Sequence, residues 1–143
     1  GHIEDLPEVI QKLIHHSIED TRSNTGMVLT LALSYGGRQE IIDAVKTIAE
    51  QVRAGQLSPE EIDSSLFESF LSTQPLPDPD LIIRTSGERR ISNFLLYQSA
   101  YTELFYSKVL WPDFSDEDFL NAIIDFQGRE RRFGMTQEQI VKA

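Results

Sequence analysis

Residues 27–33 read MVLTLAL, an almost unbroken apolar run with the length of one β-strand. Runs of this kind are typical of strands that are buried on both faces of a parallel sheet. Gly36 and Gly37 follow the run, and an amphipathic pattern over residues 39–55 then predicts a helix. A second short apolar run, residues 81–83, predicts another buried strand. The alternation of strands and helices favours an α/β fold with a mostly parallel sheet flanked by helices.

Periodicity and end signals predict the remaining elements. Pro7 suits the first turn of a helix through residue 21, and Ser58 with Pro59 starts another helix that runs to about Leu71. Residues 92–104 also have a helical pattern, and residues 105–110 have the composition of a short strand. Ser115 is expected to cap a helix from Asp116, with Asp118 at the capping-box position. The apolar face of the 39–55 helix is expected to hold Ile41, Ile42, Val45, Ile48, Ala49 and Val52.

The charge of the chain is strongly negative, with a formal net charge of −10 over 143 residues. This balance argues against nucleic acid as a partner, because broad duplex binding needs a basic surface. No cysteine is present, which excludes disulfides and thiolate metal sites and suits a cytoplasmic protein. No apolar stretch reaches about 18 residues, so the sequence predicts no membrane-spanning helix.

Positive charge gathers in one loop of this acidic chain. Arg84 is expected at the carboxyl end of the buried strand 81–83, where ligands of open α/β sheets bind. Thr85, Ser86 and Gly87 (residues 85–87) then make a turn, and Arg90 and Ser92 follow, with Ser92 near the start of the next predicted helix. Two guanidinium groups, a hydroxyl and free helix N–H groups suit a diphosphate better than a single carboxylate.

Structural alternatives exist for the same residues. The arginines can instead pair with nearby acids such as Glu88 and Asp80, and the residues alone leave the two interpretations open. Glu103 follows an aromatic segment just before the predicted edge strand. Its carboxylate could hold Mg²⁺ or cap an arginine, although a surface glutamate is the simpler interpretation.

Three segments together carry a resemblance to a known family. Residues 77–114, PDPDLIIRTSGERRISNFLLYQSAYTELFYSKVLWPDF, closely resemble the C-terminal signature of the cis-prenyltransferases, the family that includes undecaprenyl diphosphate synthase. Residues 24–45, NTGMVLTLALSYGGRQEIIDAV, and residues 129–134, RERRFG, also resemble the family at the corresponding places. The resemblance therefore covers almost the whole chain.

The resemblance implies a transferase that condenses isopentenyl diphosphate with an allylic diphosphate in cis geometry, using Mg²⁺. The product would be a long polyprenyl diphosphate, a precursor of the cell-wall lipid carrier. In the family, the equivalents of Arg84, Arg90 and Ser92 hold the diphosphate of isopentenyl diphosphate, and Glu103 matches a glutamate linked to Mg²⁺ and to the homodimer contact. The family also implies a cytoplasmic homodimer, peripheral at the membrane to which the product is delivered.

The sequence lacks the first part of the family's pattern. The loop that carries the catalytic aspartate and binds the allylic diphosphate has no counterpart here, since no Asp-Gly dipeptide occurs. Residues 1–143 are therefore expected to form a single partial domain, the C-terminal portion of the cis-prenyltransferase fold, that holds the isopentenyl diphosphate site and is inactive alone. The alternatives are a non-catalytic partner subunit of a heteromeric prenyltransferase and an unrelated phosphosugar-binding domain.

Overall fold

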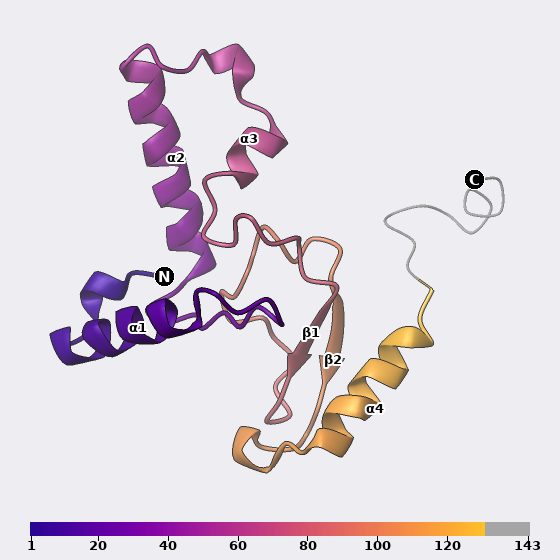
Figure 1. The fold of residues 1–143 in the computed structure, drawn as a ribbon. Coiled ribbons are helices and arrows are strands. Elements are labelled where there is room, and N and C mark those ends of the chain that lie inside the picture. Colours follow the sequence, from indigo (N-terminus) through magenta and orange to yellow (C-terminus); the bar gives the residue numbers. More distant parts are fainter. Residues whose placement is uncertain (131–143) are drawn as a thin grey trace, which may run out of the picture. The chain divides into compact units, whose positions relative to one another are not determined.

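The computed structural model describes residues 1–130, which fall into two compact units that meet in sequence at Pro75 and Leu76 (Figure 1). The first unit, Gly1–Pro75, is helical, and the second begins at Leu76 and holds the sheet. None of the helices described among residues 1–130 is both long enough and apolar enough to cross a membrane.

The first unit is built from two long helices and three short helical turns. The long helices are α1, Glu8–Thr21, and α2, Gly37–Arg53. Pro7 stands at the N-cap of α1, and Gly55, with φ of 68°, ends the α2 segment in the left-handed region that glycine tolerates. The prediction of both helices is therefore confirmed. The short turns are η1, Ile3–Asp5, η2, Pro59–Glu61, and α3, Ser64–Glu68.

The helix predicted from Ser58 to Leu71 is divided in two. η2 begins at Pro59 with Ser58 as its N-cap, as predicted, and the Ser58 amide donates to Glu61 Oε2 at 2.7 Å. Asp63 then accepts from the Leu66 amide at 2.8 Å and so caps a new helix, α3. An aspartate in extended conformation competes with helix continuation through this bond, which explains why the pattern breaks there.

The predicted buried strand at residues 27–33 is wrong for this chain. The segment is irregular and forms no ladder within residues 1–130, and Met27 and Leu29 are 89% and 74% exposed. Apolar composition alone does not make a strand, because the backbone N–H and C=O groups also need a neighbouring strand with which to pair.

The buried face of α2 also differs from its prediction. Glu40, Ala44 and Ile48, four residues apart, line the buried stripe, whereas Ile42 and Val45 are each 50% exposed. The sequence places apolar residues around much of the circumference of α2, more than its neighbours within the first unit cover. Apolar periodicity therefore identified the helix and one buried member of its face, Ile48, but not Glu40 and Ala44.

Within residues 76–130, the second unit contains a two-stranded parallel sheet and one long helix (Figure 1). β1, Leu81–Arg84, pairs with β2, Glu103–Tyr106, in a register that joins Leu81 to Glu103 and Arg84 to Tyr106. η3, Trp111–Asp113, leads to α4, Asp116–Gln127, which contacts β2 and buries Ala122 completely. The predicted α/β class with a parallel sheet is confirmed, and β2 begins at Glu103 rather than after it.

The capping prediction for α4 is confirmed in detail. Ser115 Oγ accepts from the Asp118 amide at 3.2 Å, and the Ser115 amide donates to Asp118 at 2.9 Å.

The helix predicted at residues 92–104 is wrong. Ser92, Asn93 and Leu95 have positive φ angles, which a right-handed helix cannot contain. Residues 92–101 therefore form a series of turns, and Ser92 does not stand at a helix start.

Candidate anion-binding site

The loop after β1 is fixed by backbone hydrogen bonds to the chain that follows β2. The Ser107 amide donates to Arg84 O at 2.8 Å, and the Gly87 amide returns a bond to Ser107 O at 2.8 Å. The Ser86 amide donates to Val109 O at 2.7 Å. Ser86 and Gly87 have φ angles of 68° and 70°, so the chain reverses sharply. The loop is thus a constrained turn that sets where Arg84 and the residues after it point.

Two of the predicted arginines meet at one carboxylate. Arg84 Nη2 donates to Glu88 Oε2, and Arg90 Nη2 donates to Glu88 Oε1. The hydrogen bond from Arg84, and after it the charges of both arginines, holds the pKa of the Glu88 carboxyl below its usual value. The alternative that the arginines pair with a nearby acid is therefore confirmed for Glu88. The same contacts place two guanidinium groups within reach of one small anion.

The arginines stand beside an apolar cavity of about 730 Å³ in the second unit. Arg84 and Arg90 contribute the cationic part of its lining. The rings of Trp111 and Phe114 are stacked, with centroids 6.4 Å apart, and both also line the cavity. A cavity with cationic and apolar walls suits an amphiphilic anion. The other apolar side chains of the lining include Ile82, Phe94, Leu104 and Phe119.

Ser92 and Glu103 do not join the two arginines. Ser92 is not among the residues that line the cavity. Glu103 pairs with Leu81 at the amino end of the sheet, whereas Arg84 ends β1. Three residues of strand separate the two positions, which corresponds to about 10 Å. The structure therefore brings Arg84 and Arg90 together beside the cavity, whereas Ser92 does not line it and Glu103 lies at the other end of the sheet.

Glu103 forms an ion pair with Arg129, which follows α4 in the chain. Arg129 Nη1 donates to Glu103 Oε2 at 2.8 Å and to Leu104 O at 3.0 Å, and its Nε donates to Asp125 Oδ2 at 2.8 Å. The hydrogen bond to Glu103 is the largest influence on the Arg129 pKa and raises it; burial lowers the pKa, and the bond to Asp125 raises it further. This bridge ties β2 to the end of α4. The pairing of Glu103 with an arginine, left open by the sequence, is thus confirmed.

The described residues do not form a magnesium site by themselves. Across residues 1–130, no group of three or more histidine and carboxylate side chains is placed to hold a metal ion. Mg²⁺ prefers six oxygen ligands, and Glu103 offers one carboxylate that already bonds Arg129. The metal role of Glu103 stays a prediction. The segment 131–134, which includes Arg131 and Arg132 of the RERRFG motif, lies outside the described residues.

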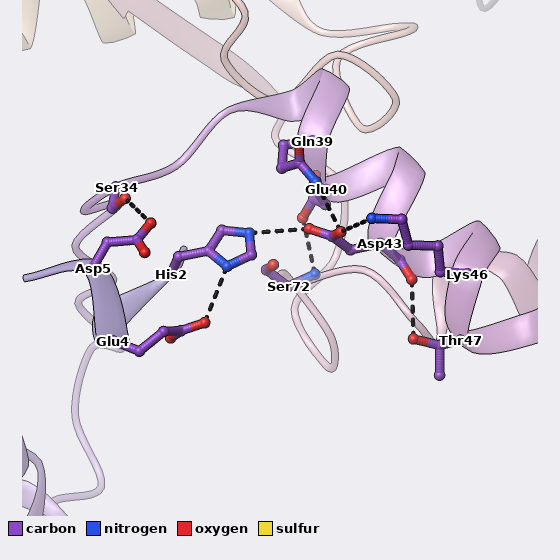
Figure 2. A network of polar contacts seen from close by, with 10 residues as sticks. All are labelled: His2, Glu4, Asp5, Ser34, Gln39, Glu40, Asp43, Lys46, Thr47 and Ser72. Atoms are coloured by element: carbon purple, nitrogen blue, oxygen red, sulfur yellow. Dashed lines mark hydrogen bonds and ion pairs between the residues drawn. The ribbon is translucent and has the colours of Figure 1, made fainter. Parts of the chain in front are cut away.

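The first unit holds a separate polar network, drawn in Figure 2, that the sequence did not reveal. The buried Glu40 accepts from Tyr35 Oη at 2.6 Å and from the Ser72 amide at 2.9 Å. His2 lies between two carboxylates, with Nε2 3.0 Å from Asp43 Oδ2 and Nδ1 3.1 Å from Glu4 Oε1. Both ring nitrogens are therefore engaged, which makes His2 a clamp between chain segments rather than a general base.

The His2 clamp predicts a pH dependence. The hydrogen bonds to Glu4 and then to Asp43 raise the His2 pKa above its ordinary value of 6.5. The stabilisation that protonated His2 provides is full below pH 6.5 and is lost as the pH rises through the raised pKa. An NMR titration of the His2 ring is expected to give a midpoint above 6.5, and Asp43→Asn should lower it. A midpoint at or below 6.5 would contradict the clamp.

Comparison with known proteins identifies the family. A family profile described as "Putative undecaprenyl diphosphate synthase" matches residues 1–134. An isoprenyl transferase of Chlorobaculum tepidum is 54% identical over 140 residues, which are 98% of this chain and 53% of that protein. The chain belongs to the undecaprenyl diphosphate synthase family of cis-prenyltransferases. The predicted resemblance is confirmed.

Other members of this family extend the comparison. The tritrans,polycis-undecaprenyl-diphosphate synthase (geranylgeranyl-diphosphate specific) of Thermoplasma volcanium is 52% identical over 94% of this chain and 52% of its own length. A crystal structure of lavandulyl diphosphate synthase from Lavandula x intermedia, in complex with dimethylallyl diphosphate, superposes with a TM-score of 0.91. It shares 40% identity, and the match covers 94% of this chain and 58% of that one. The chain spans about half the length of its cis-prenyltransferase relatives.

Proposed function

We propose that the whole protein is a cis-prenyltransferase that joins isopentenyl diphosphate to an allylic prenyl diphosphate. The product would be a long polyprenyl diphosphate, a precursor of a cell-wall lipid carrier. Family membership supports the reaction class. The observation that carries the assignment to this chain is the convergence of Arg84 and Arg90 beside an apolar cavity.

The chemistry of these side chains fits the isopentenyl diphosphate half of the site. The planar guanidinium fork donates paired hydrogen bonds to phosphate oxygens and keeps its charge at all working pH values. The apolar lining next to the arginines suits a short hydrocarbon tail. Anchoring the diphosphate fixes the position of the alkene, and this lowers the entropic cost of forming the new carbon–carbon bond. Ser92 is proposed as a further diphosphate ligand from its position in the family signature.

Mg²⁺ and the homodimer belong to the same proposal for the whole enzyme. Bound Mg²⁺ would neutralise diphosphate charge, and Glu103 is its candidate ligand in this chain. Aromatic residues are enriched at protein interfaces, and Tyr101, 64% exposed, lies in the aromatic segment before β2 that is proposed to meet the second subunit. A cytoplasmic enzyme at the membrane surface would deliver its product there.

A complementation assay tests the proposal. The chain alone is expected to give no elongated product from farnesyl diphosphate and radiolabelled isopentenyl diphosphate with Mg²⁺. Adding the N-terminal half of the Chlorobaculum tepidum isoprenyl transferase is expected to restore elongation, because that relative is 54% identical and about twice as long.

The control for this assay is the Arg84→Ala chain, which should restore at most a small fraction of the elongation. Equal rescue by wild type and Arg84→Ala would contradict the assigned site. Absence of rescue, combined with tight binding to a full-length synthase, would instead favour a non-catalytic partner subunit.

A further inference from the structure

The Glu88 carboxylate bridges the two arginines, Arg84 and Arg90. Each of its carboxylate oxygens accepts from a different guanidinium group, Oε2 from Arg84 and Oε1 from Arg90. The two arginines are therefore set apart by the width of one carboxylate. Arginine binds carboxylate and phosphate with the same fork of donors, so one geometry serves both anions.

The net charge of Arg84, Arg90 and Glu88 favours an anion with more negative charge than one carboxylate. Two arginines and one glutamate carry a net charge of +1, and a diphosphate carries more negative charge than a carboxylate. The Glu88 and Arg90 side chains are 32% and 66% exposed, so water screens their attraction. The contact of Glu88 is thus weak enough to be displaced, although its position on the same loop gives it a high effective concentration.

The backbone lets Glu88 move without moving Arg84. Arg84 ends β1, and its carbonyl is held by the Ser107 amide. Gly87, directly before Glu88, is held through its own amide by Ser107 O. A change in the Glu88 rotamer therefore removes the carboxylate from the arginines while the turn and Arg84 keep their places.

We propose that Glu88 is a built-in competitor of the diphosphate, which holds Arg84 and Arg90 together and is displaced when a diphosphate binds. The inference rests on the proposed function. It makes Glu88 a positioning residue whose contact lowers the apparent affinity, because binding requires the state in which the arginines are released.

The test is calorimetric titration of the full chain with inorganic pyrophosphate and, separately, with isopentenyl diphosphate. Glu88→Gln keeps the shape of the side chain and removes its charge. It is expected to bind both ligands about 3- to 10-fold more tightly than wild type, as the competing state is lost. Glu117→Gln removes the same charge from an exposed position on α4 and is expected to change the affinity less than twofold.

A double-variant cycle separates this inference from the function on which it rests. The gain from Glu88→Gln should vanish in the Arg84→Ala background, since the competitor then has lost its principal partner. Unchanged or weaker binding by Glu88→Gln overturns the competitor role. Equal pyrophosphate affinity of wild type and Arg84→Ala overturns the arginine site itself, and with it the proposed role of this chain.

Discussion

Arg84→Ala is expected to weaken the binding of isopentenyl diphosphate by about 10- to 100-fold, as measured by calorimetry. Arg84 ends β1, and backbone bonds fix the turn that follows, so the position of its side chain at the strand end is set by the fold. The variant loses charge-assisted hydrogen bonds to the diphosphate and leaves Glu88 near the site with one arginine fewer. Both effects act in the same direction.

Arg89→Ala is the matched control for this prediction. Arg89 carries the same charge in the same loop, but it is exposed and does not line the cavity. Its removal is expected to weaken binding less than threefold, because only the screened, long-range attraction between its charge and the diphosphate is lost. Arg84→Lys should recover part of the affinity, because the charge returns without the planar fork. Equal losses from Arg84→Ala and Arg89→Ala would show that charge alone attracts the ligand.

Glu40→Ala is expected to destabilise the first unit by about 2–4 kcal/mol. Glu40 is 8% exposed and accepts from both Tyr35 Oη and the Ser72 amide. Truncation leaves the half-buried Tyr35 hydroxyl and the Ser72 amide without this acceptor and removes a buried side chain from the stripe that includes Ala44. Chemical denaturation measures the loss of free energy, and hydrogen exchange should show faster exchange at the Ser72 amide.

Glu50→Ala provides the comparison on the same helix. Glu50 is exposed near the end of α2, and its substitution is expected to change the free energy of unfolding by no more than about 0.5 kcal/mol. Glu40→Gln should be intermediate, since the amide oxygen still accepts one bond. If Glu40→Ala were as stable as Glu50→Ala, the buried network would have no structural importance.

End signals made several elements predictable from the sequence. Ser115 and Asp118 satisfy each other and the first backbone amides of α4 by a local mechanism that needs no distant partner. Gly55 ends the α2 segment for an equally local reason. Features that depend on neighbours in space were predicted less well, as residues 27–33 show by forming no strand among residues 1–130.

The stripe on α2 contained a signal that apolar counting overlooks. Glu40, Ala44 and Ile48 stand four residues apart, so they share one face of a helix. A charged residue in such a stripe suggests a buried carboxylate with dedicated donors, which is what Tyr35 and Ser72 provide. The hydrophobic pattern predicted Ile48 correctly but added Ile42 and Val45, which are exposed, and omitted Glu40 and Ala44.

The candidate site was predictable in part for geometric reasons. A strand end followed by a glycine turn fixes Arg84 at the carboxyl edge of the sheet, and Arg90 returns to the same place through the turn. The position of Ser92 depended on a helix start, which the left-handed backbone at Ser92 and Asn93 prevents. The partner of Glu103, Arg129, lies 26 residues further along the chain, and no local pattern connects the two.

Arginine side-chain NMR tests the pairing of Arg84 and Arg90 at one diphosphate most directly. The Nε–Hε resonances of the full chain would be followed while isopentenyl diphosphate is added. The signals of Arg84 and Arg90 are expected to move together along one binding curve, while that of Arg89 stays nearly in place. Movement of Arg89 by as much as the other two, or no movement of Arg84, would contradict the account.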